Sequence, residues 1–194
     1  MSVHEQPGQR PARESEPGPD KPLSPSSAPS DADRDEMIGD LRGTPRFYEY
    51  WNRLDAVNWM GVRIVHSADG HAVASFEPEK HHRGAGVGGR AVTGATQAYI
   101  FDFVTGAAVS SLSHGVMHQV TVQLDCRYHH PAYDAPLTFE ARVQNAGRHV
   151  VFVEATCSDA TGRICSRATA VYYRFENRPA PPAADAAPSA RTDE

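Results

Sequence analysis

The chain has 194 residues, a net charge of −5, and 22% charged side chains. Charges of both signs are interspersed and no basic stripe is present, which argues against a nucleic-acid partner. Residues 1–40 are dominated by Pro, Ser, Gly, Glu and Asp, and residues 178–194 by Pro and Ala. Such segments bury too little apolar surface to offset their ordering entropy. We predict two disordered tails around one folded domain at residues 41–177.

The sequence favours a reduced, cytoplasmic protein. Residues 1–40 hold no continuous apolar stretch of the kind found in a secretory signal. The three cysteines are odd in number, lack CxxC spacing and fall in strand-like runs, where small buried thiols are common. A membrane span at residues 91–113 would place Asp102 in hydrocarbon and lacks basic flanking clusters, so we expect no membrane association.

Two early elements are predicted from local patterns. Apolar side chains in residues 44–57 recur at spacings near three and four, which predicts an amphipathic helix. Thr44 is its expected cap and Pro45 its first helical residue. Two extended runs then flank the sequence SADG at residues 67–70, and Asp-Gly predicts a hairpin turn. A glycine-rich loop, KHHRGAGVGGR, comes next.

The apolar segment after this loop holds one formally charged side chain. Within residues 91–117, Asp102 stands alone among apolar and small polar residues. Hydrophobic residues fall on nearly every side, so the segment is predicted to be a helix surrounded by other elements. Burying a lone carboxylate is costly unless it is hydrogen-bonded or used by a site. Asp102 is therefore the leading candidate for a functional residue.

After this helix the sequence period changes to two. Residues 120–128 alternate apolar and polar side chains, which predicts a half-buried strand. Strict alternation places Val120 and Val122 in its apolar set, with Thr121 opposite them.

Three further alternating runs follow on short turns, at residues 137–144, 150–157 and 164–175. Such a succession predicts an antiparallel meander. The fold class is therefore α+β, with a curved antiparallel sheet wrapped around one long central helix.

A glycine–acid–glycine spacing marks the predicted helix. Gly94 stands near its start, Asp102 eight positions later, and Gly106 four positions after Asp102. The following strand ends in Tyr-x-x-Pro-Ala at residues 128–132. Over residues 45–175 this pattern resembles the hotdog-fold acyl-CoA thioesterases of the PaaI-like type. The resemblance implies the hotdog fold and hydrolysis of an acyl-CoA, or a related acyl thioester, to a free acid and a thiol.

The resemblance also implies roles for individual residues. The helix start offers unpaired N–H groups, so the Gly94 N–H is the expected oxyanion donor. Asp102 is the expected general base or nucleophile. Thr121 matches a position where family members carry a Ser or Thr that orients water. In the family the acid and the helix-start glycine come from different subunits, so a homodimer or homotetramer is expected.

Further residues near the helix start are candidates for substrate contact. Thr93 and Ala95 stand where the family carries a His and a second Gly, and a basic loop precedes them. Cationic side chains hold phosphate well, so Lys80, Arg127 and the loop arginines are candidates for the phosphates of coenzyme A. The predicted substrate contacts are Thr93, Ala95, Gln97, His82, Arg83 and Arg90.

No cofactor and no metal are predicted. Residues 84–89 match the GxGxxG dinucleotide fingerprint by letter, but no apolar strand precedes them and no βαβ unit surrounds them. Two histidine pairs, at 81–82 and 129–130, have no carboxylate or cysteine at ligand spacing.

Three other interpretations stay open. Because Thr93 and Ala95 depart from the family pattern and residues 79–101 contain no Asn, the main alternative is a non-catalytic hotdog protein that binds an acyl chain or acyl-CoA. A hydratase of the same fold usually needs Asp-x-x-x-x-His, but Ala107 stands at that spacing from Asp102. A structural dimer with a vestigial pocket is the third.

Overall fold

The computed structural model describes residues 36, 38–84, 89–133 and 135–176. Most of the predicted tails, and residues 85–88 of the glycine-rich loop, lie outside the described residues. Disorder of the tails therefore stays a prediction.

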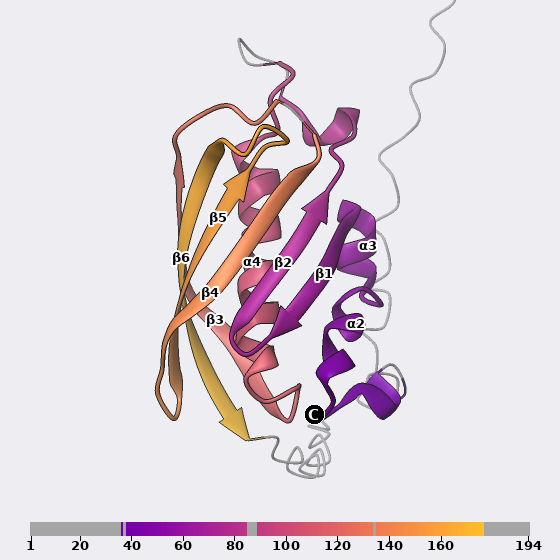
Figure 1. Ribbon diagram of the computed structural model, residues 1–194, viewed down its shortest axis with the longest axis vertical. Coiled ribbons are helices and arrows are strands. Elements are labelled where there is room, and N and C mark those ends of the chain that lie inside the picture. Colours follow the sequence, from indigo (N-terminus) through magenta and orange to yellow (C-terminus); the bar gives the residue numbers. More distant parts are fainter. Residues whose placement is uncertain (1–35, 37, 85–88, 134, 177–194) are drawn as a thin grey trace, which may run out of the picture.

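Six antiparallel strands form one sheet in the order β1-β2-β4-β5-β6-β3. Figure 1 shows this sheet curving around the central helix α4, with the short helices α2 and α3 beside β1. The strands are β1 (Val62–Ala68), β2 (His71–Phe76), β3 (Met117–Tyr128), β4 (Leu137–Ala146), β5 (Val150–Ser158) and β6 (Ile164–Glu176).

Helix α4 (Gly94–Ser111) is the centre of the core. The hydroxyl of Thr93 caps it by accepting a hydrogen bond from the Thr96 N–H at 3.2 Å. Apolar side chains on its sheet-facing side, such as Phe101 against Phe139 of β4, are fully buried beneath the sheet. The predicted α+β arrangement is thereby confirmed. Among the helices of the described residues, none combines the length and apolarity needed to cross a bilayer.

The predicted hairpin is also confirmed. Strands β1 and β2 pair directly, and the two residues between them, Asp69 and Gly70, both have positive φ, at 48° and 76°. Two consecutive residues with positive φ are the requirement of a type I′ turn, which explains the Asp-Gly pair.

The prediction of one continuous helix at residues 44–57 is wrong. The segment holds a 3₁₀ turn η2 (Pro45–Phe47), helix α2 (Tyr48–Trp51) and helix α3 (Asp55–Met60). Thr44 does cap the first turn, as predicted. The backbone becomes extended at Leu54, between α2 and α3. Just before this break, the amide of Asn52 bonds both backbone groups of Ile64 at 2.8 and 2.9 Å and so completes the outer edge of β1.

The three cysteines, Cys126, Cys157 and Cys165, lie in β3, β5 and β6 and form no disulfide. Burial raises the pKa of the Cys157 thiol to about 12. This thiol is therefore a core packing group and a poor nucleophile.

One glycine between α4 and β3 is expected to matter for stability. Gly115 has a φ of 78°, and a Cβ there would stand 2.1 Å from the Phe47 ring. We expect Gly115→Ala to lower the free energy of unfolding by about 2–4 kcal/mol, from left-handed strain plus overpacking. Gly162→Ala is the matched control, because its φ is 82° but no described atom lies within 4 Å of the new Cβ. Urea unfolding measures both; equal losses would show that the Phe47 contact contributes nothing.

Candidate active site

Asp102 lies in the middle of α4, half-buried, with its carboxylate directed at β3. The Thr121 hydroxyl donates a hydrogen bond to Asp102 Oδ1 at 2.8 Å. Within the described residues no donor reaches the other oxygen, Oδ2. The carboxylate is thus oriented through one oxygen while the second is available to accept a proton.

Thr121 reaches Asp102 because β3 contains a bulge. The register against β6 shifts between Thr121 and Gln123, so Val122 is an extra residue without a partner. The expectation that Thr121 lies opposite the apolar set of its strand is therefore wrong. Thr121 shares the α4-facing side with Leu124, which packs against the core, whereas Val122 is 64% exposed.

A third side chain, Tyr172 of β6, completes this cluster. Its hydroxyl lies 2.9 Å from the Asp102 backbone oxygen, 2.9 Å from Thr105 Oγ1 and 3.4 Å from Asp102 Oδ1. Burial raises the pKa of Tyr172, and the charge of Asp102 raises it further. The hydroxyl therefore keeps its proton near neutral pH. No role was predicted for Tyr172, although alternation in β6 places it on the same face as the buried Ala168 and Ala170.

Aromatic rings line the surface of α4 beside Asp102. The Phe103 ring lies 4.9 Å from that of Tyr99 and 6.1 Å from that of Trp51. One turn beyond Asp102, Gly106 allows Trp51 to pack on the helix, since a Cβ would stand 2.9 Å from its ring. A cavity of about 170 Å³ opens there. It is lined by Phe47, Tyr50, Trp51, Ser110, Gly115, Met117, His118 and Gln119.

The start of α4 forms a second cluster. The Gly94 and Ala95 N–H groups find no acceptor among the described residues, as expected in the first turn of a helix. The Tyr128 hydroxyl donates to the Gly94 carbonyl at 2.8 Å. A groove of about 370 Å³ opens beside Gly94, lined also by His129 and His130. The helix start can thus offer N–H donors to an anionic oxygen.

Gln97 borders this groove, but both atoms of its side-chain amide already form hydrogen bonds within the protein. Ser166 donates to Gln97 Oε1 at 2.6 Å, and Gln97 Nε2 donates to the Val92 carbonyl at 3.1 Å. The side chain is almost fully buried. These contacts give Gln97 a role in holding α4 against β6; its contact with substrate stays a prediction.

The loop residues contact the helix start through their backbone. The His82 carbonyl accepts from the Thr93 N–H at 3.0 Å, and the His82 side chain is buried. Its Nδ1 accepts from the Glu79 N–H, whereas Nε2 has no hydrogen-bond partner among the described residues. Burial lowers the pKa of His82, so the neutral ring carries its proton on Nε2.

The two loop arginines differ in their surroundings. Arg83 donates to the carbonyls of Arg90, Tyr133 and Pro78, which ties the flanks of the loop together. Arg90 is exposed. Phosphate binding by either arginine stays a prediction.

The predicted site residues therefore form two groups. Asp102 and Thr121 make one, and the helix-start residues, with Gly94 and Ala95, make the other. Asp102 lies eight positions after Gly94, which is about 12 Å along a helix. One carbonyl group cannot contact both ends at once, so a single chain does not bring the predicted base and oxyanion donor together.

Comparison with known proteins shows what this chain is similar to. A family model described as the thioesterase superfamily matches residues 90–166, the part that contains Gly94, Asp102 and Thr121. The solved structure of the PaaI protein of Escherichia coli, from the phenylacetic acid degradation operon, is 14% identical with a TM-score of 0.59. It covers 66% of this chain and 90% of that chain. The chain has the hotdog fold.

Two further similar proteins are informative. A provisionally named esterase of Saccharolobus solfataricus is 26% identical over 128 residues, covering 64% of this chain and 87% of its own length. A hypothetical thioesterase of Streptococcus pneumoniae, solved with coenzyme A, is 21% identical with a TM-score of 0.54. It covers 61% of this chain and 88% of that chain. The resemblance to PaaI-like hotdog thioesterases is confirmed, and the matches support thioester hydrolysis as the general activity.

Proposed function

We propose that this hotdog protein hydrolyses an acyl-CoA or a related acyl thioester, in an active site shared between two copies of the chain. The observation that carries the proposal is the Asp102 carboxylate, fixed by Thr121 at 2.8 Å on a helix whose first N–H groups find no acceptor among the described residues. A polarised carbonyl and a positioned carboxylate are the two requirements of thioester hydrolysis.

The proposed chemistry assigns one step to each group. Asp102 takes a proton from water, and the water oxygen forms a bond to the thioester carbonyl carbon. The carbonyl oxygen becomes an oxyanion and accepts a hydrogen bond from the N–H of Gly94 of the partner subunit. Collapse of this intermediate breaks the C–S bond, and the thiolate recovers the proton from Asp102. Direct attack by Asp102 on the carbonyl carbon is the other route open to the same geometry.

A dimer follows from the exposed edge of the sheet as well as from the spacing of the site. Strand β3 is the last strand of the sheet and has twelve residues. A long edge presents unpaired N–H and C=O groups that a second copy can pair with. Pairing two β3 edges would bring two α4 helices to the same side of one continuous sheet, where each Asp102 could meet the other copy's helix start.

The surroundings of Asp102 support an acyl substrate. Tyr99, Phe103 and Trp51 provide apolar surface on one side, and the 170 Å³ cavity beyond Gly106 is large enough for a small acyl group. Coenzyme A is proposed as the thiol because the Streptococcus pneumoniae relative was solved with it.

A thiol-release assay over a panel of acyl-CoAs tests this function. We expect wild-type protein to release free thiol from at least one member well above the uncatalysed rate. No release from any thioester, together with tight acyl-CoA binding, would instead support the non-catalytic alternative. One structural observation favours that alternative. Thr93 stands at the family's His position, and its hydroxyl is already engaged in capping α4.

A further inference from the structure

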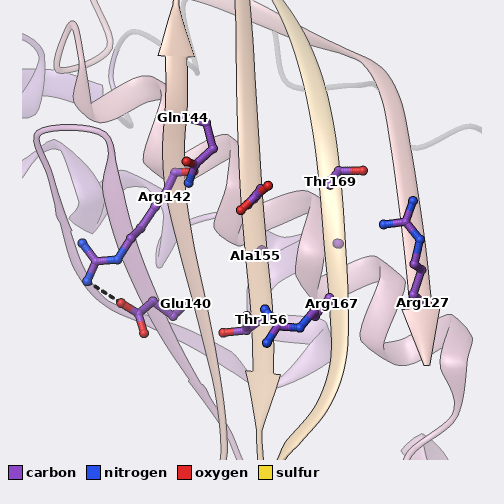
Figure 2. Close-up of a pocket in the computed structure, with 10 residues that line it drawn as sticks. Arg127, Glu140, Arg142, Gln144, Ala155, Thr156, Arg167 and Thr169 are labelled. Atoms are coloured by element: carbon purple, nitrogen blue, oxygen red, sulfur yellow. Dashed lines mark hydrogen bonds and ion pairs between the residues drawn. The ribbon is translucent and has the colours of Figure 1, made fainter. Parts of the chain in front are cut away.

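The outer face of the sheet, on the side away from α4, carries a groove that the proposed chemistry does not use. Its volume is about 290 Å³, and it crosses β4, β5, β6 and β3. Figure 2 shows its side chains standing on these strands. The groove is lined by Arg127, Glu140, Arg142, Gln144, Glu154, Ala155, Thr156, Arg167, Ala168 and Thr169.

Two arginines occupy directly opposed positions in this groove. Arg127 of β3 and Arg167 of β6 are cross-strand partners in the antiparallel register. Like charges at directly opposed positions destabilise a sheet. In Figure 2 the two side chains splay apart, with Arg167 reaching toward Thr156 and Arg127 rising toward the level of Thr169. This is the arrangement that mutual repulsion favours.

The third arginine of the groove differs in one respect. Arg142 is paired with Glu140, with its Nη2 2.6 Å from Oε1. Within the described residues, neither Arg127 nor Arg167 has an ion pair or a side-chain hydrogen bond. Glu154 lies diagonally from Arg167, opposite Thr169, yet forms no ion pair with it. The β4 side of the groove is thus internally neutralised. The β3–β6 side keeps two guanidinium groups without an ion pair, and the carboxylates of Asp125 and Glu154 stand on either side of Thr169.

Hydroxyl groups flank this cationic pair. Thr156 is the direct cross-strand neighbour of Arg167, and Thr169 stands two positions farther along β6 on the same face. Guanidinium groups without an ion pair, beside a hydroxyl, supply charge-assisted donors for a phosphate dianion. We propose that Arg127 and Arg167, with Thr156, bind a phosphomonoester on the outer face of the sheet.

This site is separate from the proposed active site. Asp102 lies on the α4 side of the sheet, whereas Arg127 and Arg167 stand on the opposite face. The phosphomonoester could be the 3′-phosphate of coenzyme A or part of another phosphorylated molecule. Both share one recognition chemistry, and binding can be measured without any turnover.

Calorimetric titration with adenosine 3′,5′-bisphosphate and with phenyl phosphate tests the site. We expect saturable binding to wild type that Arg127→Gln and Arg167→Gln each weaken at least about tenfold, because each removes a charge-assisted contact. Arg142→Gln is the matched control, since it removes an arginine from the same groove that already has a partner. Its affinity is expected to stay within about twofold of wild type, because its charge is already neutralised by Glu140.

Thermal unfolding gives an independent readout. Without phosphate, Arg167→Gln is expected to raise the Tm by about 1–3 °C, because it removes an opposed like charge. Phenyl phosphate should raise the Tm of wild type but not that of the double variant Arg127→Gln/Arg167→Gln. No saturable binding by folded wild type, or equal losses in the Arg142→Gln control, would overturn the proposal. So would an Arg127→Gln variant that binds normally but no longer dimerises.

A comparison of coenzyme A with 3′-dephospho-coenzyme A identifies the source of the phosphate. If coenzyme A supplies it, removal of the 3′-phosphate should weaken binding as much as the arginine variants do. If both molecules bind equally while phenyl phosphate still requires both arginines, the site serves a separate phosphorylated ligand.

Discussion

Replacing Asp102 with Asn is expected to preserve the fold and reduce thioester turnover by at least about a hundredfold, the lower end of a general-base contribution. The amide oxygen of Asn can still accept the Thr121 hydroxyl, which now lies 2.8 Å from Oδ1. A neutral amide cannot accept the proton of an attacking water. The change therefore removes the proton acceptor while it keeps the hydrogen bond with Thr121. The kcat from thiol release measures the loss of catalysis, and the Tm measures any loss of stability.

The matched variant is Thr121→Val, which keeps the shape of the side chain and removes its hydroxyl. A smaller loss of turnover is expected, because Asp102 keeps its charge and loses only an orienting contact. If Asp102→Asn hydrolyses its best substrate at the wild-type rate, the proposed mechanism is wrong. A large fall in Tm with turnover intact would instead mark Asp102 as a structural carboxylate.

Two inactive variants are expected to restore activity when they share a dimer. Gly94→Val should be inactive because its side chain blocks the helix-start N–H; even a Cβ at Gly94 would stand 3.1 Å from the Tyr128 ring. In a mixed dimer with Asp102→Asn, one site carries both changes and the other carries neither. Random reassortment of subunits should then recover roughly a quarter of wild-type activity, since half the dimers are mixed and each has one intact site.

Subunit exchange must be verified for this result to be decisive, so native mass spectrometry should accompany the thiol-release assay. The control mixes Asp102→Asn with the double variant Gly94→Val/Asp102→Asn, which contains no intact Asp102 and should recover nothing. Absence of recovery in verified mixed dimers would show that the base and the oxyanion donor do not come from different subunits. Light scattering that gives a monomer mass at micromolar concentration would exclude the shared site altogether.

Much of the fold could be predicted because its strongest signals are local. The Asp69-Gly70 turn, the alternating runs of β4 to β6 and the all-round apolar helix each need only neighbouring residues to be interpreted. The broken helix at residues 44–57 could not be foreseen in this way. The backbone becomes extended at Leu54, next to a contact of Asn52 with Ile64 across the fold, and no periodicity records either feature.

The candidate site was predicted in part, for the same reason. Asp102 was recognisable because an isolated charge in an apolar helix contradicts its surroundings. Its contact with Thr121 depends on the bulge at Val122, and strict alternation placed Thr121 on the wrong face. The alternation in β6 predicts that Tyr172 faces inward, but nothing in the sequence around it indicates a catalytic role. Only the structure shows that its hydroxyl adjoins the carboxylate.

The bulge also affects how this strand should be compared with others. Because Val122 has no partner in β6, Thr121 and Leu124 occupy consecutive α4-facing positions although they are three residues apart. In a relative whose third strand is regular, the equivalent residues would be two apart. An ungapped alignment would then match the wrong residue to Thr121, and a one-residue gap at Val122 is needed to identify which side chain meets the acid.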